Sequence, residues 1–345
     1  MKRKLLALFL SAFVGGSAMA QDVHFTQFFT SPLTLNPALT GLVNKDYRLA
    51  ANYRNQWYSV STPYITGTAS FDIAALKGKL DNGDALGVGL ILLYDRSGTG
   101  ALQNTTAGIS LAYHKAFGEE KNHHLSLGLQ GYLVQKSVDF SKIVFENDID
   151  VIRGVQYVGG GGGETNLGGG DLTYPDFNTG LMYSGRVSDH ATLFAGGAYY
   201  HLSQPTETFL NSSNKISARY NFYVGGSIDL NDYMVLYASG LYQKQGKAQE
   251  TLIGGAAGFI LNPLHDEYTQ NTVLYLGGWY RVGDAVNPYI GFEWEKMTFG
   301  ISYDVNLSNF APATKNQGAL EVSLIYNGGI NRYDRPKYNF TCPKF

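Results

Sequence analysis

The feature that most constrains this chain is a two-residue alternation of apolar and polar side chains in segments of about ten residues. Between Met297 and Leu307, every odd position is apolar or aromatic and every even position is small or polar. Successive residues of a β-strand point to opposite faces, so the pattern predicts strands with one oily face and one polar face. The segments that follow it lie near 47–57, 64–74, 85–95, 102–117, 124–136, 177–187, 191–201, 218–230, 233–243, 249–261, 271–281, 285–295, 297–307 and 319–327.

The length of these segments indicates a membrane. Strands of soluble proteins have roughly five or six residues, whereas a tilted strand needs about ten to cross a bilayer. An open sheet edge in lipid would leave backbone groups unpaired, so only a closed barrel is viable there. We therefore predict an all-β fold, a transmembrane antiparallel β-barrel of about 14 strands over residues 45–327. The alternative is a soluble secreted protein with two sheets packed through their oily faces.

The connections between the segments support the barrel. If the first strand starts in the periplasm, the turns after even-numbered strands are periplasmic and should be short. Short turns of this parity lie at 188–189, 231–232 and 295–296, whereas the link at 262–270 is an exception of moderate length. The longest connections follow odd-numbered strands, at 137–176, 202–217 and 308–318.

The first twenty residues predict export. Three basic residues at 2–4 precede an apolar run at 5–14 and a small-residue motif, Ala18-Met19-Ala20. This order is typical of a cleaved signal peptide, and the apolar run is too short to span a bilayer as a helix. We expect residues 1–20 to be the signal peptide and the mature protein to reside in the cell outer membrane.

The amino-acid composition narrows the class of protein further. Cys342 is the only cysteine, which excludes an internal disulfide, and the net charge of −2 gives no reason to expect nucleic acid as a partner. The chain has 42 glycines, 25 tyrosines and 19 phenylalanines, and only 16% of its residues are charged. Such a composition favours β structure over helix.

Residues 21–44 precede the first predicted strand and fit neither a helical period nor a strand. The segment is apolar, contains two prolines and carries scattered Thr, Ser, Asn and Gln residues. We expect it to fold into or under the barrel as a partial plug, since solvated tails are usually polar. The alternative is a mobile leader. The candidate plug residues are Phe25, Gln27, Phe28, Pro32, Asn36 and Pro37.

Several motifs together resemble the PorP/SprF family, which are membrane proteins of the type IX secretion system. The motifs are Phe25, Gln27, Phe28, Pro32, Leu33, Asn36-Pro37-Ala38 and Gly41; Tyr53-Arg54-Asn55-Gln56-Trp57; Val138-Asp139-Phe140-Ser141 with Phe145; Pro175-Asp176-Phe177-Asn178 with Gly180; Ser302-Tyr303-Asp304-Val305-Asn306; and Cys342-Pro343-Lys344-Phe345. They span nearly all of the mature chain in a specific order. Asn147-Asp148 and Lys344 depart mildly from the family pattern.

The resemblance implies a non-enzymatic outer-membrane barrel. Such a barrel would assist secretion or cell-surface attachment of type IX cargo, such as an adhesin, by binding the cargo and periplasmic subunits of the secretion machine. Its surroundings would be outer-membrane lipid. The alternative function is a passive outer-membrane channel or porin. Whether the chain is a general machine component or a dedicated accessory stays open.

No enzymatic or cofactor chemistry is predicted. Ser110, His114 and Asp95 could supply a hydrolase's residue types, but no local motif supports them. The adjacent pair His123-His124 is a poor metal site, because neighbouring strand residues point to opposite faces. The glycine-rich stretch 159–171 lacks the residues of a calcium repeat or a phosphate loop. We expect no cofactor and no metal.

Three groups of charged residues remain as candidates. The acidic loop at 137–176 is a candidate cargo contact through Asp148, Asp150, Glu164 and Asp171. The tail at 328–345 is a candidate contact for a periplasmic partner through Arg332, Arg335, Lys337, Cys342, Pro343 and Phe345. Inward acids at Glu293, Glu295, Asp304 and Glu321 are expected to pair with Arg54, Arg186 or Arg219 across the lumen, or to make an open pore cation-selective.

Overall fold

A computed structural model of the chain describes twelve stretches. They are 22–43, 45–59, 62–76, 80, 83–97, 102–139, 149–150, 155–156, 170–209, 212–262, 272–308 and 311–329. The predicted signal peptide at 1–20 lies outside the described residues, and so does the predicted tail from residue 330 onward.

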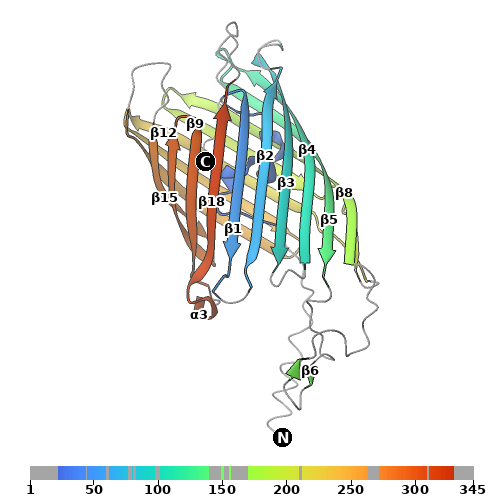
Figure 1. The fold of residues 1–345 in the computed structure, drawn as a ribbon. Coiled ribbons are helices and arrows are strands. Elements are labelled where there is room, and N and C mark those ends of the chain that lie inside the picture. Colours follow the sequence, from blue (N-terminus) through green and yellow to red (C-terminus); the bar gives the residue numbers. More distant parts are fainter. Residues whose placement is uncertain are drawn as a thin grey trace.

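The predicted barrel is confirmed: strands that follow the chain order form one closed antiparallel sheet, and β1 pairs with β18 to complete it (Figure 1). The pairing of β1 with β18 is called the seam here. The wall strands are β1 (Tyr47–Gln56), β2 (Tyr64–Ala75), β3 (Ala85–Ser97), β4 (Leu102–Phe117), β5 (His123–Val138), β8 (Gly170–Ser188), β9 (Ala191–Tyr200), β12 (Arg219–Asn231), β13 (Met234–Gln245), β14 (Ala248–Ile260), β15 (Val273–Arg281), β16 (Ala285–Trp294), β17 (Met297–Asn306) and β18 (Gln317–Gly328).

The two faces of the wall differ as the alternation predicted. On β5, Leu125, Leu127 and Leu129 point outward and are more than half exposed, whereas Ser126 and Gln130 point inward and are buried. A continuous outer surface of large apolar side chains would promote aggregation in water and suits contact with lipid. The inner face carries polar and aromatic side chains, glycines and a smaller number of buried aliphatic side chains such as Met182, Leu241 and Leu252.

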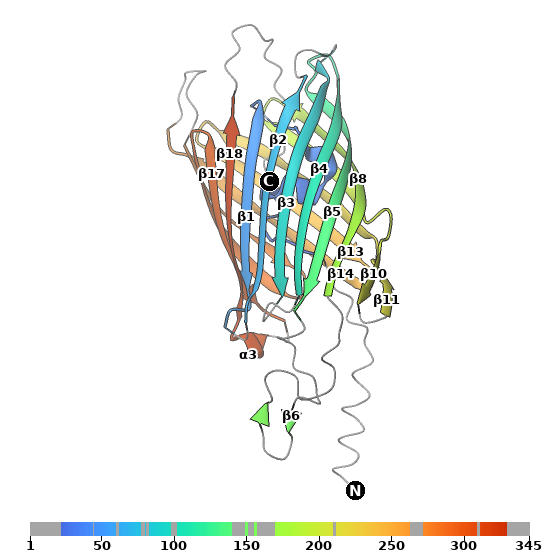
Figure 2. The ribbon, with the colours of Figure 1, turned by 45° about the vertical axis from the view of Figure 1, so that its right-hand side comes forward.

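The two ends of the barrel carry different connections. The end called the loop rim joins strands through 139–169, 201–218 and 307–316, which contain the short elements β6 (Ile149–Asp150), β7 (Val155–Gln156), β10 (Thr206–Phe209), β11 (Ser212–Lys215) and α3 (Ala311–Thr314). Figure 2 shows β6, β10, β11 and α3 at this one end. The opposite end, the turn rim, joins strands through 118–122, 189–190, 232–233 and 295–296, and through two longer connections at 76–84 and 261–272, the second of which contains the predicted exception. Long loops on an outer-membrane barrel face the cell exterior.

Residues 22–43, called the lumen segment, lie inside the barrel. Three one-turn helices shape it: η1 (Phe28–Thr30), α2 (Pro32–Leu35) and η2 (Pro37–Leu39). Each proline occupies the first turn of its helix, where no hydrogen-bonding N–H is needed. The Asn36 side chain caps η2 by accepting a hydrogen bond from the Ala38 N–H at 2.8 Å. These short turns explain why the stretch has neither a helical nor a strand period.

The lumen segment crosses the interior from one rim to the other. Asp22 lies beside His201 and Gln245 at the loop-rim ends of the wall strands. Gly41 lies beside Asp72, opposite the start of β1 near the turn rim. No helix among the described residues is long and apolar enough to cross a membrane.

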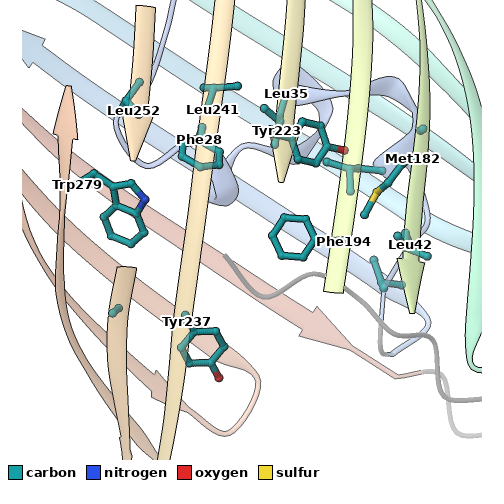
Figure 3. Packing of buried hydrophobic residues seen from close by; sticks show 14 of the residues in the cluster. Phe28, Leu35, Leu42, Met182, Phe194, Tyr223, Tyr237, Leu241, Leu252 and Trp279 are labelled. Carbon is teal, nitrogen blue, oxygen red and sulfur yellow. The ribbon is translucent and has the colours of Figure 1, made fainter. Parts of the chain in front are cut away.

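An apolar cluster fills the centre of the barrel (Figure 3). The lumen segment contributes Phe28, Leu35 and Leu42, and all three are buried. Phe29 packs beside the cluster, with its ring 4.8 Å from that of Trp279 and 5.6 Å from that of Tyr289. The wall contributes mainly Met182, Phe194, Tyr223, Tyr237, Leu241, Leu252, Tyr275, Trp279 and Tyr289. The barrel therefore has a packed core that is built around its own N-terminal segment.

Candidate functional site: the lumen segment and its contacts

The six candidate plug residues all lie inside the barrel, and each of them is buried. Gln27 and Asn36 have no exposed surface at all, although both side chains are polar amides. A buried amide is tolerated only where it is hydrogen-bonded, so the wall must supply its partners. Whether the segment closes the lumen to ions is a functional question, and it stays a prediction.

Beside the seam, a carboxylate of the wall binds the backbone of the lumen segment. The two oxygens of Glu321 on β18 accept hydrogen bonds from the N–H groups of Thr26 and Gln27, at 2.8 Å and 2.9 Å. The Gln27 side chain donates to Ser302 at 3.0 Å and accepts from Ser323 at 2.7 Å. The segment is thereby fixed to β17 and β18 through both its backbone and its side chain.

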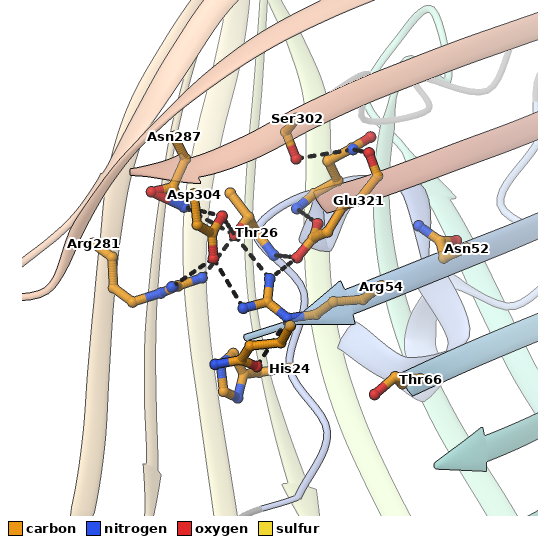
Figure 4. Close-up of polar contacts among 12 residues, drawn as sticks. His24, Thr26, Asn52, Arg54, Thr66, Arg281, Asn287, Ser302, Asp304 and Glu321 are labelled. Carbon is orange, nitrogen blue, oxygen red and sulfur yellow. Dashed lines mark hydrogen bonds and ion pairs between the residues drawn. The ribbon is translucent and has the colours of Figure 1, made fainter. Parts of the chain in front are cut away.

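Around Thr26 lie four charged wall residues, called the seam cluster: Arg54, Arg281, Asp304 and Glu321 (Figure 4). Asp304 accepts hydrogen bonds from Arg54 and Arg281 at 2.9 Å each, and Arg54 also pairs with Glu321. The Thr26 hydroxyl donates to Asp304 at 2.9 Å and accepts from Arg281 at 2.7 Å. All four charged side chains are buried, and two cations face two anions, so the charges compensate each other.

The expected charge pairs are partly correct. Arg54 pairs with Asp304 and Glu321 as predicted, and β1 and β18 place Arg54 directly opposite Glu321. Two predicted positions were wrong: Arg186 is exposed on β8, and Glu295 is exposed in the turn after β16. Proximity to a strand end explains both errors, because the regular alternation stops there.

Other charged residues inside the barrel have partners that differ from the predicted ones, or were not predicted at all. Glu293 accepts a hydrogen bond from Tyr275 at 2.5 Å. Arg219 pairs with Asp22 at 3.2 Å rather than with an acid of the last strands. Arg281 also pairs with Glu250 at 3.2 Å. Arg281 was not among the residues predicted to pair in the lumen. Its inward position in the alternation of β15 was the signal that could have found it.

On the opposite wall, glycine residues make room for the lumen segment. A Cβ atom on Gly128 of β5 would lie 2.2 Å from the backbone of Pro37 and Ala38. One on Gly180 of β8 would lie 1.9 Å from the Asn36 side-chain oxygen. Real Cβ atoms do not approach so closely, so only glycine permits this contact. Asn36 then donates to the carbonyls of Leu181 and Gly197, at 2.9 Å and 3.2 Å.

Near the turn rim, the end of the lumen segment is held by a second charged pair. Asp72 accepts a hydrogen bond from the Gly41 N–H at 2.7 Å and pairs with Arg48 at 2.7 Å. Arg48 also donates to the Leu39 carbonyl at 3.0 Å. Gly41 has a φ of +71°, and a Cβ on Gly87 would lie 1.8 Å from the Thr40 carbonyl oxygen. Two glycines therefore meet where the segment turns into the wall.

At the loop rim, the first described residues form a further ionic group. Asp22 contacts His201 at 2.6 Å, and His201 contacts Asp176 at 2.7 Å. Burial would lower the pKa of His201, but the two carboxylates raise it to about 9. Burial would likewise raise the pKa of Asp22, but Arg219 and His201 hold it well below its usual range. His201 is therefore a cation at neutral pH, and it holds the start of the lumen segment.

A hollow of about 60 Å³ remains in the lumen beside this group. Tyr132, Tyr174 and Tyr200 line it together with charged residues. Lys136 pairs with Glu207, and Arg219 stacks over the Tyr200 ring at 4.0 Å. The charged groups of the hollow thus already have protein partners, as expected for a lumen that is filled from within.

The residues weighed for enzymatic chemistry have structural roles. Ser110 bonds to the Thr40 hydroxyl at 2.6 Å, and His114 contacts the Thr40 carbonyl oxygen at 2.8 Å. Asp95 accepts a hydrogen bond from Thr66 at 2.6 Å, away from both. Among the described residues, no group of three or more His, Cys, Asp and Glu residues is arranged to hold a metal ion.

The candidate cargo and partner residues fall mostly outside the described residues. Asp148 and Glu164 lie outside them, and Asp150 belongs to the two-residue strand β6. Asp171 is exposed at the loop-rim end of β8. The tail residues Arg332, Arg335, Lys337, Cys342, Pro343 and Phe345 also lie outside the described part of the chain. Their roles stay predictions.

Comparison with known proteins decides the family. The model of the type IX secretion system membrane protein PorP/SprF matches residues 17–326, which is nearly the whole chain. The chain belongs to the PorP/SprF family. The match includes the lumen segment as well as the wall, so this PorP/SprF protein carries the segment as part of its family architecture. A search of curated protein sequences gives no match.

Solved structures similar to this PorP/SprF protein are outer-membrane barrels. The toluene transporter TbuX of Ralstonia pickettii aligns with a TM-score of 0.52 and 10% identity, covering 92% of this chain and 96% of that chain. A deletion mutant of the TodX monoaromatic hydrocarbon channel aligns with a TM-score of 0.50 and 9% identity, covering 88% and 94%. At these identities the likeness shows the fold alone. With the family match, it places this PorP/SprF protein in the outer membrane as a barrel associated with type IX secretion.

Proposed function

We propose that the protein is a plugged, non-enzymatic barrel that assists secretion or surface attachment of type IX cargo. In this proposal the barrel binds cargo through its loop rim and secretion-machine subunits through its periplasmic side. The family match over residues 17–326 is the observation that carries the proposal. The role is binding rather than chemistry, since the buried Ser, His and Asp side chains hold the lumen segment or the wall.

The lumen segment supports a binding role over a transport role. A channel for ions or polar solutes needs a continuous polar path, and its charges must be available to the passing solute. Here the seam cluster is occupied by Thr26 and Gln27, and the centre of the barrel is filled by an apolar cluster. A passive channel is the alternative, and it would require this segment to leave the lumen.

Purification of the native complex tests the proposal. The full-length tagged protein, extracted from its own outer membrane in mild detergent, should retain a large secreted protein or secretion subunits. A matched preparation of an unrelated outer-membrane barrel controls for carry-over. Recovery of the barrel alone from cells that actively secrete type IX cargo would contradict the proposal.

Single-channel recording tests the plug separately. The full chain should conduct weakly in a planar bilayer, and deletion of residues 22–41 should produce large, steady openings. Equal conductance of the two proteins would show that the lumen segment does not close the barrel. Strong conductance of the full chain, without any partner, would favour the channel alternative.

A further inference from the structure

The outer wall carries a cationic pocket at the loop rim that none of the roles above uses. It lies where β12 begins and β13 ends, beside the β10–β11 hairpin, and it has a volume of about 300 Å³. The residues that give it chemical character are Gln204, Lys215, Ser217, Tyr220, Lys244 and Gly246. Among the described residues that line it, none carries a carboxylate. The pocket therefore offers two ammonium groups and polar donors to an anion.

Lys215 and Lys244 differ in ion pairing from an outward-facing lysine at the turn rim. There, the outward-facing Lys115 pairs with Asp84 at 2.9 Å. Within the described part of the chain, neither Lys215 nor Lys244 forms an ion pair, and both are exposed. Lys247 is exposed in the neighbouring turn and adds to the positive charge. Unpaired lysines on a hollow surface attract an anionic group from outside the protein.

The surroundings of the pocket identify the kind of anion. Lys244 lies directly opposite Tyr220 in the sheet, on the face that contacts lipid. The Tyr220 ring packs edge-on against Tyr199 at 4.9 Å, which places two tyrosines at the boundary of the apolar surface. Further along β12, Phe222 and Val224 point into the bilayer and are more than half exposed. Cationic and apolar surfaces are thus continuous along one strand.

We propose that this pocket binds the phosphorylated headgroup of a lipid in the outer leaflet, with its acyl chains against Phe222 and Val224. Ammonium groups near a membrane surface strengthen the binding of anionic lipid, so loss of both lysines should weaken binding by roughly 30-fold. The site lies on the outer wall, outside the lumen, so lipid can reach it without displacing the lumen segment.

Native mass spectrometry of the full chain in detergent tests the proposal. Added phosphatidylglycerol should bind more tightly than phosphatidylcholine, and the Lys215→Gln/Lys244→Gln double variant should lose that preference. The matched control is the Lys121→Gln/Lys296→Gln double variant. It removes the same amount of charge from turns at the turn rim and should keep the preference for phosphatidylglycerol. Folding of both variants is checked by the mobility of unheated samples on gels.

Three outcomes would overturn the proposal. The first is unchanged lipid preference in the Lys215→Gln/Lys244→Gln variant. The second is an equal loss in the control variant, which would indicate a general effect of net charge. The third is displacement of the lipid by millimolar inorganic phosphate, which would indicate a site for the free anion rather than for a membrane lipid.

Discussion

Two walls of the lumen hold the same segment by different physical means. The seam side, formed by β1 and β15 to β18, presents buried charges that bond to Thr26 and Gln27. The far side, formed by β3, β5 and β8, presents Gly87, Gly128 and Gly180, whose lack of a side chain lets the backbone approach. Buried charges fix a position strongly but are costly when a partner is lost. Glycines contribute shape and little bonding of their own.

The comparison shows why the lumen segment must be both polar and apolar. Its first part carries Thr26 and Gln27, which meet charged groups, and its middle carries prolines and leucines that pack against glycine and aromatic residues. Exchanging the two parts would leave buried carboxylates without donors. The order of residue types along the segment is therefore set by the wall that each part faces.

The largest effect is expected on the seam side. Arg54→Met leaves Glu321 and Asp304 with one cation fewer in a buried site, which should cost about 3–5 kcal/mol of folding free energy. Urea unfolding in detergent or vesicles measures the loss. Arg186→Met is the matched control, because Arg186 is exposed, and it should change stability by less than about 0.5 kcal/mol.

A second substitution sharpens this result. Adding Glu321→Gln to Arg54→Met removes the unpaired charge and keeps one acceptor, which can serve either the Thr26 or the Gln27 N–H. The double variant should then be more stable than Arg54→Met alone. If it is less stable by the sum of the two single effects, the seam cluster does not act as one charge network.

On the glycine side, Gly128→Ala should displace the segment without disturbing the wall. The new Cβ would lie 2.2 Å from the backbone of Pro37 and Ala38, and such overpacking costs about 1–3 kcal/mol. We expect increased ion conductance and faster cleavage of the segment by added protease. Gly131→Ala on the same strand is the control, because its Cβ would meet only Phe177 at 3.7 Å. Equal conductance and equal rates of cleavage in the two variants would contradict the steric explanation.

A smaller effect should come from Asn36, which makes polar contacts with the wall on the glycine side. Asn36→Asp keeps the shape and the acceptor for Ala38 but cannot donate to the carbonyls of Leu181 and Gly197. The lost bonds should cost about 1–3 kcal/mol in unfolding measurements. Asn36→Ala loses donor and acceptor together. A variant Asn36→Asp as stable as the parent chain would mean that these carbonyls do not hold the segment.

The smallest effect concerns pH. The pKa of His201 is raised to about 9, so the stability it contributes is complete below about 6.5 and is lost as the pH rises through 9. Asp22 has a lowered pKa, so its contribution is lost only in acid. We expect about 1 kcal/mol of destabilisation between pH 7 and 10. His201→Gln should flatten this part of the stability profile, and an unchanged slope would contradict the assignment.

The sequence predicts the wall far better than the contents of the lumen. Alternation over ten residues reports only the two faces of a strand, and this suffices for the fourteen strands and their order because neighbouring strands pair in sequence. The pair Arg54 and Glu321 could also be foreseen, since both are inward charges on strands that must meet at the seam. Periodicity therefore fixes the fold class and one part of the site.

The remainder of the site depends on the path of an aperiodic segment. Thr26 bonds to Arg281, and Asp22 bonds to His201, across separations of 255 and 179 positions. No periodic pattern in the sequence predicts these contacts, because they depend on how the three short helices of the lumen segment pack inside the closed barrel. The sequence analysis also gives no reason for Gly128 to be glycine, whereas in the structure a Cβ atom there would collide with the backbone of Pro37 and Ala38.

The path of the lumen segment bears on how the barrel assembles. Thr26 and Glu321 are 295 positions apart, and they meet beside the seam. The seam joins β18 to β1, which directly follows the segment. If the barrel closed while its lumen was empty, the segment would have to enter afterwards and compete with arginines already paired with acids. We therefore expect closure of the seam and insertion of the lumen segment to be coupled in biogenesis.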